Sequence, residues 1–201
     1  RLYKTAVQTE VMEKYHDIGT SVNISVLNWL RGLPTKNFLL SSFPEGEKIS
    51  GKVFAEKHLI RRFSCAGCPI GCVHIAALKT AFSEHHEFEV RRVSYDYEPI
   101  YSLGSNLGVK TAEGILQLID ACERLGLDVM SAGVVLSWAT EALEKGLITE
   151  KETTGVPLLW DEVEGYAKAL NLMVRAPNEF YASLARGAEY AAAKYGGLEY
   201  A

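Results

Sequence analysis

The stretch Cys65-Ala66-Gly67-Cys68-Pro69-Ile70-Gly71-Cys72 is the most specific pattern in this chain of 201 residues. Two residues separate its first pair of cysteines and three separate its second pair, so a short loop can direct three thiolates at one point. Gly67 and Gly71 permit the unusual backbone angles that such a wrap requires, and Pro69 stiffens it. Soft thiolates at this density select zinc or an iron–sulfur cluster. The stretch therefore predicts a metal centre.

The identity of the fourth ligand decides between these two metals. A 4Fe–4S cluster needs four ligands, usually all cysteine. The remaining cysteine, Cys122, stands beside Leu118 and Ile119 on the apolar face of a predicted helix, where we expect it to be a core residue. A zinc site would instead combine the three cysteines with one histidine, either His74 or His58. We favour the iron–sulfur cluster over zinc, and both over three unlinked thiols.

The composition is that of an ordinary globular domain. Hydrophobic residues make up 48% and charged residues 23%, which excludes a disordered polymer and a disulfide-dense miniprotein. The net charge of −4 argues against binding to nucleic acid. Charged residues within Arg1–Asp17 argue against a signal peptide, and the apolar window Met130–Trp138 is too short to span a bilayer. We predict a cytoplasmic protein with no nucleic-acid or membrane partner.

Apolar periodicity and capping residues predict a mostly α domain. The segment Val73–Ala77 and the segment Phe88–Ser94 favour strands, so we expect a small β-hairpin excursion around 73–94. Gly32–Gly46 reads as an ordered loop. The predicted helices span Leu2–His16, Thr20–Leu30, Ser50–Arg62, Thr111–Arg124, Asp128–Lys145, Asp161–Val174 and Asn178–Tyr195.

Several stretches occur in the order typical of one family. They are Gly-Leu-Pro-Thr-Lys-Asn-Phe at 32–38, the cysteine loop at 65–72, Tyr-Glu at 97–98, Leu-Gly-Ser-Asn-Leu-Gly at 103–108, Glu-Arg-Leu-Gly-Leu-Asp at 123–128 and Ser-Ala-Gly at 131–133. The chain resembles the tungsten- or molybdenum-containing aldehyde:ferredoxin oxidoreductase family. The resemblance implies that residues 1–201 form the first helical domain of a longer subunit. The N-terminal β-rich pterin domain and the last helical domain would be absent from this chain. Because the chain begins at Arg1 and not at Met, we also interpret it as a piece of a longer polypeptide.

The resemblance assigns Cys65, Cys68 and Cys72 as three of the four ligands of a 4Fe–4S cluster. The family's fourth cysteine belongs to the last domain, beyond Ala201, and Cys122 does not match it. A tungsto- or molybdo-bispterin would bind in the full enzyme. We therefore expect the isolated chain to lack a complete cluster site and most pterin contacts, with no cofactor necessarily bound.

The resemblance also implies roles for three acidic residues and one glycine. Glu98 matches the family's active-site glutamate, whose implied role is proton transfer, and we expect a raised pKa there in a partly apolar pocket. The alternatives are an exposed loop acid or an acid at a helix start beside Pro99. Asp128 matches a pterin-binding carboxylate, while Gly126 allows close approach; the alternative or additional role of Asp128 is a helix N-cap. Glu123 stands where the family has aspartate, which leaves its pterin role open.

The function implied by the resemblance is oxidation of aldehydes to carboxylic acids, with electrons passing through the cluster to ferredoxin. The other domains of the subunit, ferredoxin and the aldehyde would be its partners, and a homodimer is also allowed. An aromatic acyl-CoA reductase of the same family is the alternative enzyme. A stand-alone zinc-binding helical interaction module is the alternative from another class. We assign no subunit-bridging iron, because Gln117 and Asp120 stand at the corresponding helix, and we interpret His85 and His86 as exposed loop residues.

Overall fold

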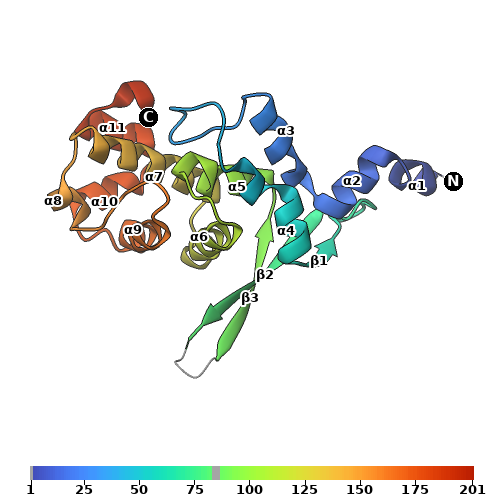
Figure 1. Cartoon of the computed structure of the whole chain (residues 1–201). Coiled ribbons are helices and arrows are strands. Elements are labelled where there is room, and N and C mark those ends of the chain that lie inside the picture. The colour runs from blue at the N-terminus through green and yellow to red at the C-terminus, as the bar shows by residue number, and fades with distance from the viewer. Residues whose placement is uncertain (1, 83–86) are drawn as a thin grey trace.

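The computed structural model describes residues 2–82 and 87–201, and it shows a helical body from which a small antiparallel sheet projects (Figure 1). This confirms the mostly α fold class. The strands of the described chain are β1 (Leu59–Phe63), β2 (Val73–Ala81) and β3 (Phe88–Tyr95). Its helices are α1 (Leu2–Val7), α2 (Glu10–Ile18), α3 (Asn23–Trp29), α4 (Gly51–Lys57), α5 (Tyr97–Leu103), α6 (Ala112–Leu125), α7 (Val129–Glu144), α8 (Glu150–Thr153), α9 (Val163–Arg175), α10 (Glu179–Leu184) and α11 (Ala188–Tyr195). Within the described residues, no helix has the length and apolar character needed to cross a membrane.

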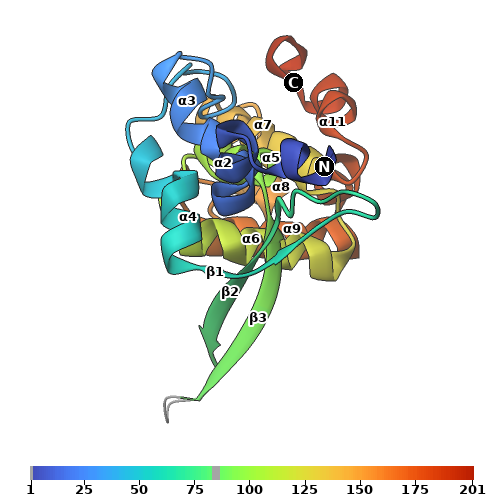
Figure 2. The same cartoon turned by 90° about the vertical axis from the view of Figure 1, so that its right-hand side faces the viewer.

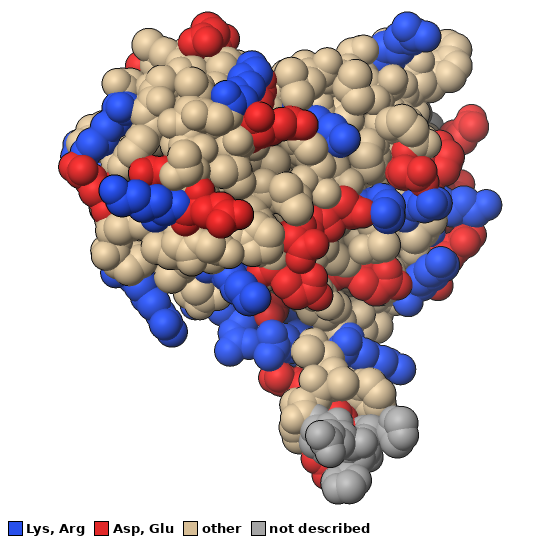
Figure 3. All heavy atoms as spheres, turned by 60° about the vertical axis from the view of Figure 1, so that its left-hand side comes forward, with Lys and Arg blue, Asp and Glu red and all other residues tan. Residues whose placement is uncertain are grey.

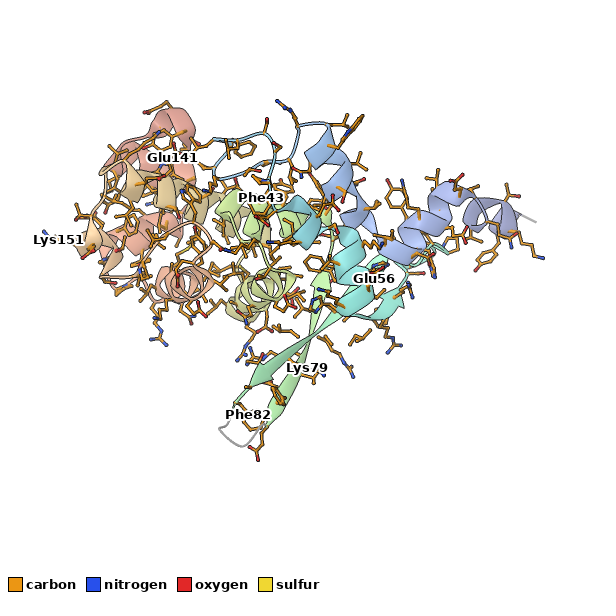
Figure 4. The ribbon with its side chains drawn as sticks, viewed as in Figure 1. Phe43, Glu56, Lys79, Phe82, Glu141 and Lys151 are labelled. Carbon is orange, nitrogen blue, oxygen red and sulfur yellow. The ribbon has the colours of Figure 1, made fainter. Side chains whose placement is uncertain are left out.

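The sheet has the order β1-β2-β3, and β2 pairs antiparallel with both neighbours. The β2–β3 pairing confirms the hairpin predicted around 73–94. Lys79 and Phe82 lie on its distal half, which extends away from the helices (Figure 4). His85 and His86 lie outside the described residues. The hairpin is therefore an arm whose base joins the helical body.

A salt bridge ties this arm to the body. The Arg91 guanidinium on β3 lies 2.6 Å from the Asp120 carboxylate on α6. Figure 3 shows basic side chains gathered where the arm leaves the body. Asp120 is thus paired with a strand residue across the junction.

The helix predicted over Ser50–Arg62 is wrong in its second half. Helix α4 ends at Lys57, and the chain then forms β1, which pairs with β2 after an irregularity between Leu59 and Arg61. The side chains of β1 do not alternate between buried and exposed, because four of the five are exposed. Its backbone becomes a strand because β2 supplies hydrogen-bond partners, which local helix preference cannot outweigh.

Two predicted helices are each divided in two. The side chain of Thr9 accepts a hydrogen bond from the Met12 amide (3.3 Å), so Leu2–His16 becomes α1 and a newly capped α2. Gly187, with φ 106°, separates α10 from α11 inside the predicted Asn178–Tyr195 helix. Helix α5, which carries Glu98, is not among the predicted helix spans, and the sequence indicates it only through the helix-start alternative for Glu98.

The predicted pair α6 and α7 forms the centre of the core, and Figure 2 shows them behind the N-terminal helices. Thr111 caps α6 through the Gly114 amide, as predicted. Cys122 on α6 is 0% exposed, which confirms it as a core residue, and burial raises the pKa of its thiol to about 12. The core thiol is therefore unavailable as a metal ligand.

The loop at 32–46 docks on the turn that follows α5. Lys36, Asn37 and Phe38 all have left-handed backbone angles, with φ of 49°, 53° and 61°. The amides of Lys36 and Asn37 donate to the carbonyls of Ser105 (3.0 Å) and Asn106 (3.1 Å). Two stretches of the sequence resemblance, 32–38 and 103–108, therefore pack against each other, and these hydrogen bonds offset the strain of three non-glycine residues with positive φ.

Candidate cluster and cofactor site

The cysteine loop connects β1 to β2 at the edge of the molecule beside the N-terminal helices (Figure 1). Cys65 is exposed, and Cys68 and Cys72 are partly exposed. The Cys68 amide donates to the Cys65 carbonyl at 3.0 Å, which forms a tight turn. Gly67 and Gly71 have φ of 74° and 73°, so both glycines serve the left-handed conformations that the sequence predicted.

The structure does not bring the three thiols together. Within residues 2–82 and 87–201, no group of three or more His, Cys, Asp or Glu side chains is arranged to hold a metal ion. Bound metal supplies the positive charge that holds thiolates at one point. The loop suits a cluster in its donor set and its accessibility, and among the described residues no atom would lie within 4 Å of a Cβ on Gly67. The loop therefore has space to close around a metal centre.

The two histidines proposed as zinc ligands differ in their contacts. His74 is 1% exposed, its Nε2 lies 2.9 Å from the His16 carbonyl, and its Nδ1 lies 3.3 Å from the Tyr95 hydroxyl. Burial lowers the pKa of His74, which favours the neutral ring. These partners argue against His74 as a zinc ligand. His58 Nε2 lies 3.3 Å from Glu113 Oε1, but this buried nitrogen has no hydrogen-bond partner among the described residues.

Glu98 is exposed in the first turn of α5, as the helix-start alternative expects. The rings of the nearby Tyr97 and Tyr101 pack against each other, with their centroids 5.1 Å apart. Burial and the charge of Glu98 together raise the pKa of the neighbouring Asp96 carboxyl, and they raise the pKa of Tyr101 in the same way. The turn thus presents one accessible carboxylate next to an aromatic pair.

Asp128 stands at the corner between α6 and α7. Gly126 ends α6 with φ 71°, and the Leu127 amide donates to the Cys122 carbonyl at 2.9 Å. Asp128 Oδ1 accepts from the Ser131 amide at 2.7 Å, which confirms its N-cap role and lowers the pKa of its carboxyl. Partial burial and the nearby Asp120 raise the pKa of Glu123. Glu123, Gly126 and Asp128 are all exposed at this corner, so a ligand can reach them.

Hydrogen bonds connect the three predicted parts of the site. His16 Nδ1 lies 2.7 Å from the Ile70 carbonyl of the cysteine loop. The Thr20 hydroxyl, in the next turn of chain, accepts from the Tyr97 amide at 3.1 Å. At the other end of α5, the Ser102 hydroxyl donates to the Met130 carbonyl at 3.2 Å, beside the Asp128 corner. The residues at 16–20 thus hold both the cysteine loop and the start of α5.

Sequence reasoning missed His16. It lies at the end of an amphipathic helix and is exposed, 54 positions from its partner in the loop. A histidine in that position carries no local signal for such a contact. The sequence suggested His74 only as a zinc ligand. In the structure its ring instead makes hydrogen bonds.

The structure thus combines a largely helical domain with a loop that bears three accessible thiols and with exposed carboxylates at helix starts. The family described as aldehyde ferredoxin oxidoreductase, domains 2 & 3, matches residues 1–201. The chain therefore belongs to the aldehyde ferredoxin oxidoreductase family.

Two curated relatives support this. The chain is 33% identical over 147 residues to a tungsten-containing aldehyde ferredoxin oxidoreductase of Pyrococcus furiosus, covering 73% of this chain and 23% of that protein. It is 29% identical over 203 residues to the protein of the same name from Pyrococcus horikoshii, covering 100% and 32%. The chain thus spans between about a quarter and a third of the length of these relatives.

A solved structure shares the fold. The active site complex BamBC of benzoyl coenzyme A reductase, in complex with 1,5 dienoyl-CoA, superposes with a TM-score of 0.56. The sequence identity is 23%, and the match covers 74% of this chain and 21% of that chain. This likeness concerns the fold alone.

Proposed function

We propose that this chain is part of an enzyme that oxidises aldehydes to carboxylic acids. The observation that carries the proposal is the three-cysteine loop, accessible at the end of the sheet, in a chain that matches the family over residues 1–201. When bound, a tungsten-bispterin cofactor and a 4Fe–4S cluster supply the redox chemistry. The protein itself contributes ligands, a proton acceptor and cofactor contacts.

Each predicted residue has a definite part in this proposal. Cys65, Cys68 and Cys72 would hold three corners of the cluster, which would supply the electron relay to ferredoxin. Oxidation of a hydrated aldehyde to the acid releases an electron pair and protons. Glu98, exposed in the first turn of α5, accepts a proton.

The corner between α6 and α7 supplies the proposed pterin contacts. The Asp128 carboxylate accepts the Ser131 amide with one oxygen, Oδ1, so its other oxygen can accept ring N–H groups of a pterin. Gly126 leaves room for close approach, because among the described residues no atom would lie within 4 Å of a Cβ there. Glu123 offers a second carboxylate at the same corner.

The fourth cluster ligand and most pterin contacts would come from the rest of a longer subunit. This agrees with the relatives, of which the chain spans 23% to 32%. Ferredoxin is the proposed electron acceptor, and the cytoplasm the proposed location. A homodimer is compatible with the proposal and not required by it.

The decisive experiment compares two cysteines in the full-length subunit. After anaerobic reconstitution with iron and sulfide, the wild type and Cys122→Ala should both show the broad visible absorption of an iron–sulfur cluster and oxidise aldehydes with ferredoxin as acceptor. Cys68→Ala should lose this absorption. A Cys68→Ala subunit with an intact cluster would contradict the ligand assignment.

The same preparation separates the alternatives. Reduction of an aromatic acyl-CoA without aldehyde oxidation would identify the reductase of the family instead. Stoichiometric zinc, held tightly by the purified chain at neutral pH, would favour the interaction module. Iron together with sulfide supports the enzyme.

A further inference from the structure

His16 touches the cysteine loop from outside. It stands in the last turn of α2, and its Nδ1 lies 2.7 Å from the carbonyl oxygen of Ile70, between Cys68 and Cys72. It also closes one end of a groove of about 210 Å³ between the N-terminal helices and the loop, lined by Tyr3, Val7, Met12, Pro69 and Ile70. The loop is thus braced against a separate helical segment at one backbone group.

The fit at this contact is close. A Cβ on Gly71 would lie 3.0 Å from His16 Nδ1, which is tighter than an ordinary contact. Gly71 also has φ 73°, so both its conformation and its neighbour require glycine. The cysteine loop therefore passes His16 with no room for a side chain.

His16 is itself held from both strands that flank the loop. Its carbonyl oxygen lies 2.9 Å from Nε of Arg62 on β1 and 2.9 Å from Nε2 of His74 on β2. The Tyr95 hydroxyl on β3 lies 3.3 Å from His74 Nδ1. Contacts from β1 and β2 thus converge on one residue of α2, and Tyr95 of β3 contacts His74 behind them.

The donors and acceptors in this chain agree with one another. The His16 carbonyl can only accept, so His74 donates from Nε2, and its Nδ1 is left to accept from the Tyr95 hydroxyl. The Ile70 carbonyl can only accept, so His16 donates from Nδ1. Every bond therefore runs in one direction, from the buried sheet to the exposed loop.

We propose that His16 is a positioning residue for the cluster, acting through the carbonyl of Ile70. This inference rests on the proposed function, because it requires a cluster on Cys65, Cys68 and Cys72. In a trans peptide the C=O and N–H groups point in opposite directions. Holding the Ile70 carbonyl against His16 turns the Gly71 N–H away from α2, where it is available to a cluster sulfur. Hydrogen bonds to the sulfurs set the reduction potential of such clusters.

The test uses three substitutions of His16 in the reconstituted full-length subunit. The amide nitrogen of asparagine occupies the place of Nδ1, whereas that of glutamine occupies the place of Nε2. His16→Asn should therefore keep the wild-type midpoint potential and electron paramagnetic resonance spectrum of the reduced cluster. His16→Ala and His16→Gln should shift the potential to more negative values and alter the spectrum, because the N–H donor to the cluster is no longer held.

A folding defect is distinguishable from an effect on the cluster, because His16 is exposed and His16→Gln preserves the size and polarity of the side chain. Iron and sulfide content and the thermal unfolding midpoint are measured on each variant. A His16→Ala subunit with the wild-type potential and spectrum would overturn the inference, as would His16→Asn behaving like His16→Ala. A wild-type subunit without an iron–sulfur cluster would instead refute the proposed function on which the inference rests.

Discussion

The side-chain amide of Asn37 donates a hydrogen bond of 2.6 Å to Oε2 of Glu141, across 104 positions of the chain. Asn37 is 8% exposed and Glu141 is 1% exposed. Lys145 lies 2.5 Å from the other oxygen of Glu141, and the Ser137 hydroxyl donates to Asn37 Oδ1 at 2.9 Å. The 32–46 loop is therefore fastened to α7 by a buried carboxylate that residues of both segments contact.

Replacing Asn37 by aspartate should destabilise the fold at neutral pH. The substitution keeps the shape but exchanges an N–H donor for a second carboxylate beside Glu141, at a cost of about 3 kcal/mol. Urea unfolding at pH 7 measures it. Asn37→Gly is the control, because glycine tolerates φ 53° and removes the side-chain hydrogen bonds without adding charge. Its loss of unfolding free energy should therefore be smaller than that of the aspartate variant. Equal stability of the aspartate variant and the wild type would contradict this picture.

The Asp128 cap should stabilise the protein in a pH-dependent manner. Its folded-state pKa is lowered, mainly by the hydrogen bond from the Ser131 amide. The stabilisation is therefore complete above the ordinary value of 3.8 and is lost as pH falls through the folded-state pKa. We expect Asp128→Ala to cost about 1 kcal/mol at pH 7.

Asp128→Asn is the matched control, since asparagine caps a helix but does not titrate. Urea unfolding from pH 7 to pH 3 should show the wild type losing stability relative to Asp128→Asn at the acid end. Parallel pH profiles for the two proteins would exclude a role for the charge.

Gly133 on α7 should not tolerate even alanine. A Cβ there would lie 2.1 Å from the Ser102 hydroxyl and 2.5 Å from the Ser102 carbonyl oxygen on α5. Alanine favours a helix by about 1 kcal/mol over glycine, but overpacking against backbone costs about 1–3 kcal/mol. Thermal unfolding should show a lower midpoint for Gly133→Ala. The exposed helical substitution Lys168→Ala should leave the midpoint nearly unchanged, and a raised midpoint for Gly133→Ala would be inconsistent with this contact.

The four thiols should differ in reactivity in the metal-free protein. Cys65, Cys68 and Cys72 are accessible, whereas Cys122 is buried with its pKa raised to about 12. A thiol reagent such as Ellman's reagent at pH 8 should modify three cysteines rapidly and the fourth only after denaturation. In Cys122→Ala the slow phase should disappear. Rapid reaction of all four thiols in the native wild type would argue against the core position of Cys122.

The helices at the centre of the fold could be predicted because their signals are local. Thr111 and Asp128 each precede an apolar run and cap it through an amide three residues ahead. Strand β1 could not be predicted, because its side chains are mostly exposed and only pairing with β2 makes it a strand. Gly187 stands at the start of α11 with φ 106°, inside a continuous helical pattern of sequence that does not reveal the break.

The candidate site likewise has a part that the sequence predicts and a part that it does not. The cysteine spacing alone predicts a metal-binding loop, because Cys65, Cys68 and Cys72 lie close together in the chain. The bracing of that loop by His16 joins residues 54 positions apart, and the attachment of α5 through Thr20 and Tyr97 joins residues 77 positions apart. Contacts of that separation have no local periodicity, so only the folded chain reveals them.

The sheet order β1-β2-β3 also bears on the sequence of events during folding. Strand β1, the cysteine loop and β2 follow one another directly, so their contacts close short segments of chain. The Asn37–Glu141 contact closes more than a hundred residues. Short closures lose less chain entropy and form faster than long ones. The cysteine loop is therefore able to take shape before α7 has docked on the rest of the domain.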